Sequence, residues 1–444
     1  MRDELQEELT IFKETVNRFI ENEIAPFYHE WEANKLVPKT VWHKMGQEGL
    51  LCCDLPEQYG GFGVSYDFNM VVAEALAQAG FFALSCSVVV HADIAAHYVL
   101  NMGTEAQKEK YLSKMASGEC IGAICMTEPG AGSDLQGLKT TAITTDYGWS
   151  ISGSKTFITN GQNADLYIIA ARTNLEVATA KGLSLFLVDG DSEGFSRGQN
   201  LTKIGQHAAD TSELFLDNVK VTEDDLLGEV DKGFAGLMNE LPRERLSLAC
   251  TAVAHAEGAL ELAKNYVMER QAFGGSLSKL QDIRFKLAEM ATKTETHRVL
   301  IESYKLLLSE KKLTTAQASM AKYATTEMEC EVVDMALQMF GGYGYMEEYP
   351  NSRFYVDARI QRIYGGASEI MKEIIARDLV GRARLSLLAR EVDVLKGLDN
   401  LSKPFCLKPY FTLRQIVISL FKSSDFRLLT LFFHSNSLVS KSSK

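Results

Sequence analysis

The hydrophobic period of the chain changes twice, and this feature most restricts the fold it can adopt. In residues 1–120 apolar residues recur at helical spacing, as in LQEELTIFKETVNRFIENEI, which predicts helices with one apolar side. Between residues 121 and 232 the chain changes to short β-rich runs separated by Asn-Gly and Asp-Gly turn signals. From Leu241 onward it is again rich in Ala and Leu at helical spacing. The sequence therefore predicts a mainly helical α+β protein, with helices first, then a sheet, then helices.

The middle region, 121–232, is predicted to form a small antiparallel β domain. Its β-rich runs are WSISGSKTFI, DLYIIAA, LSLFLVD and SELFLDNVKV, and DYGW at 146–149 is typical of a hairpin turn. Parallel strands are usually joined by crossover helices of a dozen or more residues. No run of helical spacing separates these segments, so we expect the strands to pair antiparallel.

Residues 233–382 are predicted to form a second helical region. A long Ala- and Leu-rich helix is expected from Leu241, with Pro242 near its first turn, where proline is tolerated. Further helices are predicted over 279–309 and 314–340, and another is predicted to begin near Ala367. We therefore expect three domains, 1–120, 121–232 and 233–382.

The last segment, 383–444, has a different composition from the rest of the chain. It is poor in acidic residues and rich in Ser, Leu and Phe, without a clear helical stripe. Charged residues, among them Arg414 and Lys422, interrupt it too often for a membrane span. We expect a poorly ordered appendage; the alternative is a basic segment that touches a membrane surface.

Charge and composition exclude several classes of function. The chain has 46 Lys and Arg against 58 Asp and Glu, a formal net charge of −12, and the missing basic face argues against a nucleic-acid partner. None of the eight cysteines forms a CxxC pair and the eight histidines show no HxxxH pattern. This pattern predicts buried free thiols in a reducing compartment and no metal site.

Two further segments bear on location. The apolar run FFALSCSVVVHADIAAHYVL carries His91, Asp93 and His97, which favours a buried helix over an integral membrane segment. The first residues, MRDELQEELTIFKETV, are acidic and helix-like, unlike a signal or transit peptide. We expect a bacterial cytoplasmic protein, and the alternative is a processed protein of the mitochondrial matrix.

Four glycine-containing loops stand out, and each by itself is an ordinary turn. They are ICMTEPGAGSD at 124–134, FITNG at 157–161, QMFGGYGYMEEYP at 338–350 and IYGGASEIM at 363–371. None contains the GxGxxG or GxxxxGK[ST] patterns of phosphate-binding loops. The paired glycines in the last two loops leave backbone bare for the close approach of another group.

Taken together and in this order, the motifs resemble those of the acyl-CoA dehydrogenase family over roughly residues 5–380. The specific pieces are MTEPGAGSDLQGLKT, SKTFITNG, RQAFG, QMFGGYGYMEEYP and IYGGASEIMKEIIAR. ELPRERL, AKYAT and YMEEYP are most similar to the long-chain type. The resemblance implies an N-terminal helical domain, a central β domain and a C-terminal four-helix bundle around FAD. It also implies dehydrogenation of an acyl-CoA thioester to the trans-2-enoyl-CoA, a homodimer or dimer of dimers, and electron-transferring flavoprotein as acceptor.

The resemblance also implies a set of cofactor-binding residues. The 124–133 loop is expected on the flavin, with Ser133 near the substrate as well, and residues 157–159 on the other side of the ring. Arg270 is expected to pair with a diphosphate, as a planar guanidinium suits phosphate oxygens. The 281, 338 and 341–342 positions are expected at the FAD of the partner subunit. The full set is Ile124, Met126, Thr127, Gly132, Ser133, Phe157, Ile158, Thr159, Arg270, Phe273, Gln281, Gln338, Gly341, Gly342, Ala367, Ser368 and Glu369.

The chain departs from the commonest family pattern at the catalytic base. Many relatives carry the catalytic glutamate where this chain has Gly365. Glu244 in LPRERL matches the alternative base of long-chain and isovaleryl members, and it needs a pKa raised by desolvation. The N–H of Gly365 is expected to donate to the thioester oxygen, with Tyr364, Gly366 and Arg245 also at the substrate. The alternative interpretation of Glu244 is a solvated side chain near the start of a helix.

Two other functions stay open at this point. An acyl-CoA oxidase would pass its electrons to oxygen, although oxidases usually carry an extra C-terminal helical domain. A flavin- or acyl-CoA-binding homologue without activity would follow if Glu244 did not replace the acid missing at position 365. The sequence leaves acyl chain length, branching and the choice between dimer and tetramer undetermined.

Overall fold

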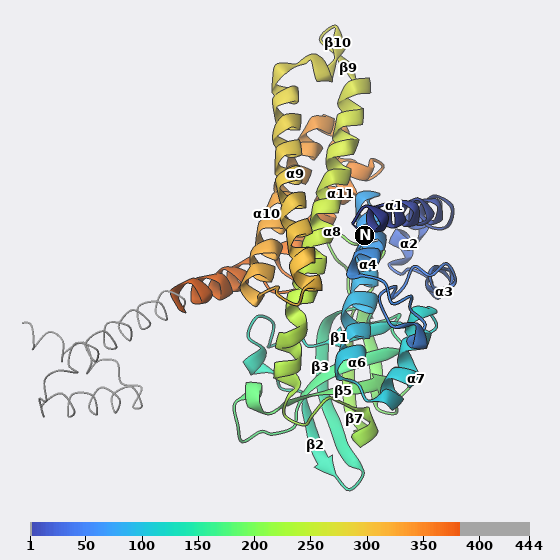
Figure 1. Ribbon diagram of the computed structural model, residues 1–444, viewed down its shortest axis with the longest axis vertical. Coiled ribbons are helices and arrows are strands. Elements are labelled where there is room, and N and C mark those ends of the chain that lie inside the picture. Colours follow the sequence, from blue (N-terminus) through green and yellow to red (C-terminus); the bar gives the residue numbers. More distant parts are fainter. Residues whose placement is uncertain (1, 382–444) are drawn as a thin grey trace, which may run out of the picture. The chain divides into compact units, whose positions relative to one another are not determined.

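The computed structural model describes residues 2–381, and the predicted appendage at 383–444 lies outside these residues. Almost all of the described chain belongs to one compact unit, Met1–Ala376. Figure 1 shows helices, then strands, then long helices along the chain, which confirms the predicted fold class. The domain boundaries at 120, 232 and 382 stay predictions.

The N-terminal region consists of short helices around a buried one. The amphipathic first helix, α1, becomes more buried toward its end, where Val16 and Phe19 reach the core. A capping box between Thr104 and Gln107 starts α7. The helices are α1 (Arg2–Phe19), α2 (Tyr28–Asn34), α3 (Lys39–Gln47), α4 (Tyr66–Gln78), α5 (Phe82–Val88), α6 (Ala96–Met102) and α7 (Glu105–Ala116), with π-helical segments η1 (Ile20–Ile24) and η3 (Val89–Ala95).

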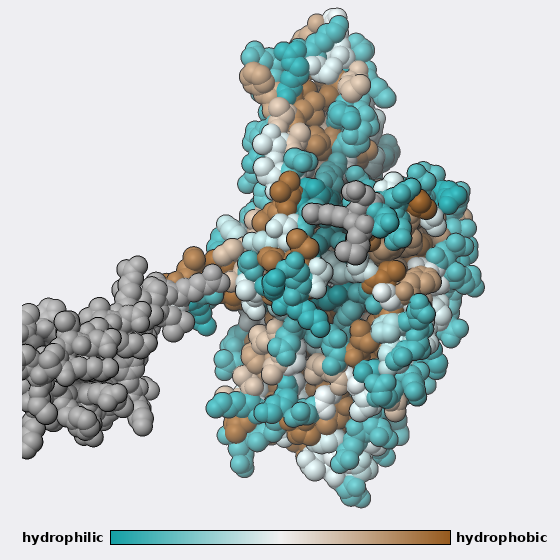
Figure 2. Space-filling view, in the orientation of Figure 1, coloured by the Kyte–Doolittle hydropathy of each residue, from teal (hydrophilic) through white to brown (hydrophobic). Residues whose placement is uncertain are grey.

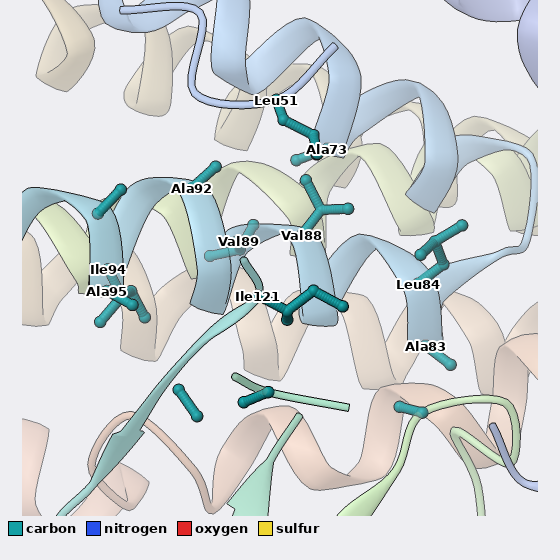
Figure 3. Packing of buried hydrophobic residues seen from close by; sticks show 14 of the residues in the cluster. Leu51, Ala73, Ala83, Leu84, Val88, Val89, Ala92, Ile94, Ala95 and Ile121 are labelled. Carbon is teal, nitrogen blue, oxygen red and sulfur yellow. The ribbon is translucent and has the colours of Figure 1, made fainter. Parts of the chain in front are cut away.

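Segments α5, η3 and α6 form one continuous helical run, Phe82–Met102. Among the described residues it alone is long and apolar enough to cross a bilayer, and 89% of its most apolar window is buried inside the protein. Figure 3 shows Val88, Val89 and Ala92 of this run packed among Leu51, Ala73 and other core side chains. The prediction of a buried helix here is confirmed.

The middle region forms an eight-stranded sheet in the order β6-β7-β3-β2-β4-β5-β8, with β1 paired to β4. The predicted hairpin turn is present, because Thr145 of β2 pairs with Gly148 of β3. The strands are β1 (Gly122–Cys125), β2 (Thr141–Thr145), β3 (Gly148–Thr159), β4 (Leu166–Arg172), β5 (Leu183–Asp189), β6 (Phe195–Asn200), β7 (Thr211–Val221) and β8 (Leu226–Leu227).

Most of these strand pairs are antiparallel as predicted, but two are parallel. β1 pairs parallel with β4 over four residues, and β2 meets β4 parallel at Thr141 and Arg172. The prediction took crossover helices to be necessary for parallel strands. Here the long loop after β1 and the β2–β3 hairpin bring the chain back to β4 without an α-helix, so the sheet is mixed.

The C-terminal region consists of long helices that run side by side (Figure 1). They are α8 (Gly233–Glu269), α9 (Gln281–Ser309) and α10 (Thr315–Phe340), followed by α11 (Pro350–Ala358) and a helix that begins at residue 368. The small β9–β10 hairpin (Gln271–Ala272 and Gly275–Ser276) joins α8 to α9. The bounds predicted for α9 and α10 are confirmed to within two residues.

The predicted start of α8 was wrong. The helix begins at Gly233 rather than Leu241, and Pro242 lies inside it. Proline has no N–H, so the carbonyl of Met238 lacks its usual helical partner. A proline near an apolar run is ordinarily a sign of a helix start, and that rule misplaced the boundary here.

The described cysteines are all free. Six are buried, and Cys330 is half-buried. Burial raises the pKa of the Cys125 thiol well above its ordinary value, which keeps it protonated and unreactive. This matches the expectation of buried free thiols, while Cys406 lies outside the described residues.

An ion-pair network joins the N-terminal helices to the long helices. Glu74 on α4 accepts hydrogen bonds from Arg298 at 2.6 Å and Lys305 at 2.8 Å, both on α9. Arg298 also binds both carboxylate oxygens of Glu257 on α8, at 2.9 and 2.7 Å. The Glu74 side chain is 16% exposed, so these charges are largely removed from water.

We predict that Glu74→Ala lowers the free energy of unfolding by about 2 kcal/mol, because it removes one carboxylate from two largely buried cations. Urea-induced unfolding measures the loss. The control is Glu261→Ala at an exposed site of α8, which should change stability by less than about 0.5 kcal/mol. Equal effects of the two changes would contradict the prediction.

Candidate active site

Glu244 lies well inside α8, where it is buried. Glu244 is 5% exposed, and the phenol of Tyr98 on α6 donates a hydrogen bond of 2.8 Å to its Oε1 atom. Burial raises the pKa of Glu244 to about 7; Tyr98 and Arg245 oppose this rise, and Glu240 adds to it. The alternative interpretation of Glu244 as a solvated residue at a helix start is therefore wrong.

The guanidinium of Arg245 forms its hydrogen bond with α10 and not with Glu244. Its Nη1 atom donates to the hydroxyl of Ser319 on α10 at 3.3 Å. Its Nη2 atom lies 3.9 Å from the position that a Cβ of Gly366 would occupy. Arg245 thus lies between α10 and the 365–366 turn.

The turn at Gly365 and Gly366 packs against α8 beside Glu244. Both glycines have positive φ, +63° and +100°, where a side chain is strained. A Cβ on Gly365 would lie 2.3 Å from Cδ1 of Leu248, which stands one helical turn after Glu244. Leu248 therefore links the Gly365 turn to the part of α8 that carries Glu244.

A buried lysine also holds this turn. The Lys322 residue on α10 is fully buried, and its Nζ donates to the carbonyl of Gly366 at 2.7 Å. Burial lowers the pKa of Lys322 to about 8, with Arg245 adding to the effect. The hydroxyl oxygen of Tyr364 is buried, and this burial together with the nearby Cys86 raises the pKa of Tyr364 well above its ordinary value.

The loop after β1 is fixed by a buried ion pair. Lys155 on β3 is 1% exposed; its Nζ lies 2.8 Å from Oε1 of Glu128 and also donates to the carbonyls of Ala170 and Met126. Glu128 further accepts the backbone N–H groups of residues 139 and 140 at 2.6 and 3.0 Å. One carboxylate thus holds both ends of this loop.

The same contacts bring two predicted cofactor segments together. The N–H of Thr156 donates to the carbonyl of Thr127 at 2.9 Å, so the loop lies beside β3. A register shift in β3 precedes Ile158, and Phe157 has φ of +58° and is 66% exposed. Gly132 has no atom within 4 Å of an added Cβ. The Thr156–Thr127 hydrogen bond therefore joins a strand segment with an exposed aromatic ring to a loop with open space at a glycine.

The buried helical run joins this segment to Glu244. Asn160, directly after β3, donates to the carbonyl of Ser87 in α5 at 3.0 Å. Tyr98 stands on the same run, about 16 Å farther along if each residue rises 1.5 Å. The β3 segment and Glu244 are thus held by one rigid helical run.

A third group of predicted residues lines a cavity of about 510 Å³ at the far end of α8. It includes Arg270, Gln338, Gly341 and Gly342. An added Cβ at either glycine would meet nothing within 4 Å. The guanidinium of Arg270 lies 5.5 Å from the ring centroid of Tyr343, and the remaining lining residues are mostly apolar.

The other predicted residues lie around these groups. Phe273 is 92% exposed in the β9–β10 hairpin, and Gln281 is exposed at the start of α9; neither lines the cavity. Ala367 and Glu369 flank Ser368, whose hydroxyl donates to Glu327 on α10 at 2.8 Å. Ile124 in β1 pairs with Ile168 of β4.

The described chain has one cluster with the spacing of metal ligands. Asp54, Asp93 and His97 place their polar atoms within 4.8 Å of one another. Nη2 of Arg243 lies 2.6 Å from Asp54 and 2.9 Å from Asp93. These carboxylates already have a cationic partner.

Comparisons with known proteins decide the family. Three acyl-CoA dehydrogenase domain models match the chain: the N-terminal domain over residues 6–119, the middle domain over 123–219 and the C-terminal domain over 231–380. The chain belongs to the acyl-CoA dehydrogenase family. The predicted resemblance is confirmed, and members of this family are FAD-dependent flavoprotein oxidoreductases of fatty-acid and branched-chain acyl oxidation.

Individual relatives point to the long-chain type. The long-chain specific acyl-CoA dehydrogenase of Rattus norvegicus mitochondria is 44% identical over 371 residues, 83% of this chain and 86% of that protein. Mitochondrial isovaleryl-CoA dehydrogenase of Solanum tuberosum is 34% identical over 370 residues, 83% of this chain and 89% of that protein. The crystal structure of an acyl-CoA dehydrogenase from Geobacillus kaustophilus is 42% identical, with a TM-score of 0.81 over 84% of this chain and 98% of that chain. Relatives of this acyl-CoA dehydrogenase thus include mitochondrial and bacterial enzymes.

Several residues of the candidate site were absent from the sequence prediction. Glu128 and Lys155 were inside quoted motifs, yet nothing in the sequence paired them. Lys322 was within AKYAT, where a lysine on a helix ordinarily faces solvent. Tyr98 gave the least signal, since a tyrosine in an apolar helix is usually a core residue.

We predict that Glu128→Ala lowers the free energy of unfolding by about 3 kcal/mol, because Lys155 would stay buried without its carboxylate. Urea-induced unfolding measures this, and limited proteolysis should show faster cleavage within residues 126–140. Glu109→Ala at an exposed site of α7 is the control. An unchanged unfolding midpoint for Glu128→Ala would contradict the role of the ion pair.

Proposed function

We propose that this acyl-CoA dehydrogenase converts a saturated acyl-CoA thioester to its trans-2-enoyl-CoA, with Glu244 as the base that removes the α proton. The observation that carries the proposal is a buried carboxyl group with a pKa near 7, packed beside the Gly365 turn through Leu248. A base is most effective when its pKa lies near the working pH. Fatty-acid or branched-chain acyl oxidation is the process that this reaction serves.

The Gly365 turn is proposed to receive the thioester oxygen. Removal of the α proton places negative charge on that oxygen, and a preorganised backbone N–H stabilises it. The absence of a side chain at Gly365 leaves room for close approach, and Lys322 fixes the following carbonyl. Tyr364, Gly366, Arg245 and Ser133 are the other proposed substrate contacts.

The residues fit FAD as the cofactor, which supplies the hydride acceptor of the reaction when bound. The exposed ring of Phe157 and the open space at Gly132 in the 126–140 loop leave both segments accessible to a planar ring. Arg270 and the open glycines 341 and 342 form a cradle suited to a diphosphate and its attached groups. The proposed cofactor contacts are Ile124, Met126, Thr127, Gly132, Ser133, Phe157, Ile158, Thr159, Arg270, Phe273, Gln281, Gln338, Gly341, Gly342, Ala367, Ser368 and Glu369.

The length of α8 supports a homo-oligomer with shared sites. Glu244 and Arg270 stand on one helix about 39 Å apart at 1.5 Å per residue, too far for one cofactor to join them within a chain. Figure 2 shows apolar surface among the long helices. Around the β9–β10 hairpin, Met268 at the end of α8, Phe273 in the turn and Phe285 near the start of α9 are 58%, 92% and 63% exposed. Such patches mark interfaces. We therefore propose a dimer, or a dimer of dimers, whose electrons pass to electron-transferring flavoprotein.

We predict that Glu244→Gln slows anaerobic flavin bleaching by saturated acyl-CoAs roughly 10²–10⁴-fold, the range of general-base catalysis. The substrate series runs from short to long straight chains and includes isovaleryl-CoA. Glu261→Gln, an exposed site on the same helix, should bleach at the wild-type rate.

Other outcomes of this experiment decide between functions. Bleaching of Glu244→Gln at the wild-type rate would show that another group is the base. Acyl-CoA binding to the wild-type protein without any bleaching would favour an inactive homologue. Stoichiometric hydrogen peroxide in air would favour an acyl-CoA oxidase.

We predict that Arg270→Ala weakens FAD binding about 10-fold or more, the loss expected for a charge-assisted hydrogen bond. Flavin content of the purified protein and titration of the apoprotein with FAD measure the loss, and size-exclusion chromatography shows whether the oligomer survives. Arg284→Ala at an exposed site of α9 is the control. Full flavin content in Arg270→Ala would remove Arg270 from the cofactor site.

A further inference from the structure

Tyr98 is a fully buried tyrosine that touches the proposed base. It stands on α6 at 0% exposure, and its hydroxyl donates to Oε1 of Glu244 across 146 residues of sequence. Among the described residues Oε1 is the Glu244 oxygen with a hydrogen-bond donor. Oε2 is thereby left to accept a proton from another group.

The phenol stays a donor over the working pH range. Burial raises the pKa of Tyr98 well above its ordinary value, and the carboxyl groups of Glu244 and Glu240 add to the rise. A hydrogen bond from a neutral donor favours the ionised form of a carboxyl group. Tyr98 thus opposes the effect of burial on Glu244, which by itself favours the protonated acid.

Further contacts fix α6 and η3 against α8 on both sides of this bond. Asn101 donates to both carboxylate oxygens of Glu240 at 3.0 and 3.1 Å, one helical turn before Glu244. Arg243 of α8 pairs with Asp93 of η3 at 2.9 Å. The Tyr98 ring therefore cannot follow a movement of Glu244 without breaking neighbouring polar contacts.

The groups that act on Glu244 come from both helices. Tyr98 approaches from α6, while Glu240 and Arg245 belong to α8. Glu240 is a like charge and favours the protonated form of Glu244, whereas Arg245 favours the carboxylate. Tyr98 alone among them contacts Glu244 through a hydrogen bond.

We propose that Tyr98 is the positioning residue of the base: its hydroxyl holds one oxygen of Glu244, orients the other oxygen for proton removal, and keeps the group ionised near neutral pH. This inference rests on the proposed role of Glu244. It adds a residue that none of the sequence motifs contains.

The test is the Tyr98→Phe variant of the full-length, flavin-loaded protein. The infrared carbonyl band of protonated Glu244, identified by its loss in Glu244→Gln, should titrate about one pH unit higher than in wild type, since a hydrogen bond to a charged group is lost. The rate of anaerobic flavin reduction should fall about 5-fold at pH 7, because the ionised fraction of Glu244 falls from about one half to about one eleventh, and it should recover toward the wild-type rate at higher pH. The dissociation constant of the acyl-CoA should change less than about 2-fold.

Tyr66→Phe is the matched control. Tyr66 on α4 is also buried, and its hydroxyl lies 2.8 Å from the hydroxyl of Ser247, which stands on α8 together with Glu244. This variant loses a buried tyrosine hydrogen bond next to Glu244 without touching it. Its infrared titration and pH–rate profile should match those of the wild type, whatever its melting temperature.

A second variant at position 98 keeps the proposal testable if Tyr98→Phe fails to fold. Replacement of Tyr98 by 3-fluorotyrosine makes the phenol a stronger donor with little change in size, and should lower the titration midpoint of Glu244. A midpoint unchanged in both Tyr98 variants, or moved equally by Tyr66→Phe, would overturn the proposal.

The infrared titration needs no turnover, so it separates this proposal from the proposed function. If no acyl-CoA bleached the wild-type flavin, the proposed reaction would fail. A shifted midpoint in Tyr98→Phe would still establish the control of Glu244 by Tyr98.

Discussion

The rest of the structure depends on α8, because this one helix contacts the sheet, the N-terminal helices and the other long helices. α8 starts with Gly233 against the backbone of Leu183 in the sheet and carries Glu244 beside α6. It ends at Glu269, directly before Arg270 at the distant cavity. Between these points Glu257 is bound by Arg298 of α9. Because a helix is rigid along its axis, a movement at one of these contacts is transmitted to the others. α8 is therefore the common frame on which the N-terminal helices, the sheet and the other long helices are held.

Buried charge is used in two different ways around this frame. Lys155 and Glu128 neutralise each other and bind nearby backbone groups, and these interactions fix the loop. Glu244 has no cation bound to it among the described residues, and its hydrogen-bond donor is the neutral Tyr98. A paired charge gives rigidity, whereas a carboxyl group that is desolvated and unpaired can exchange its proton near neutral pH. The rigid Lys155–Glu128 pair fixes the loop, while the unpaired Glu244 keeps the ability to exchange a proton.

Much of the fold followed from local pattern. The 3.6-residue period located α9 and α10 because each is bounded by clear turn and cap residues, including the Thr314 capping box. The start of α8 was missed because Pro242 gives the same signal at a helix start as inside a helix that tolerates it. The parallel pairing of β1 with β4 was missed because strand partners are set by long-range packing rather than by the strand's own residues.

The candidate site also contains residues that the sequence could predict and residues that it could not. Gly365 and Glu244 could be predicted because they lie in motifs that resemble those of a family, and one substitution drew attention to the other. Tyr98, Lys322 and Glu128 could not be paired with their partners, because these contacts join residues far apart in the chain. Burial turns an ordinary tyrosine or lysine into part of a site, and burial is a property of the fold.

The Gly365 turn also restricts the mutational routes open to this chain. A side chain introduced at position 365 would have to adopt a left-handed backbone conformation and displace Leu248 from its packed position. Leu248 in turn belongs to the helix face that carries Glu244. An acidic side chain at position 365 would therefore require compensating changes on two elements at once, the turn and α8.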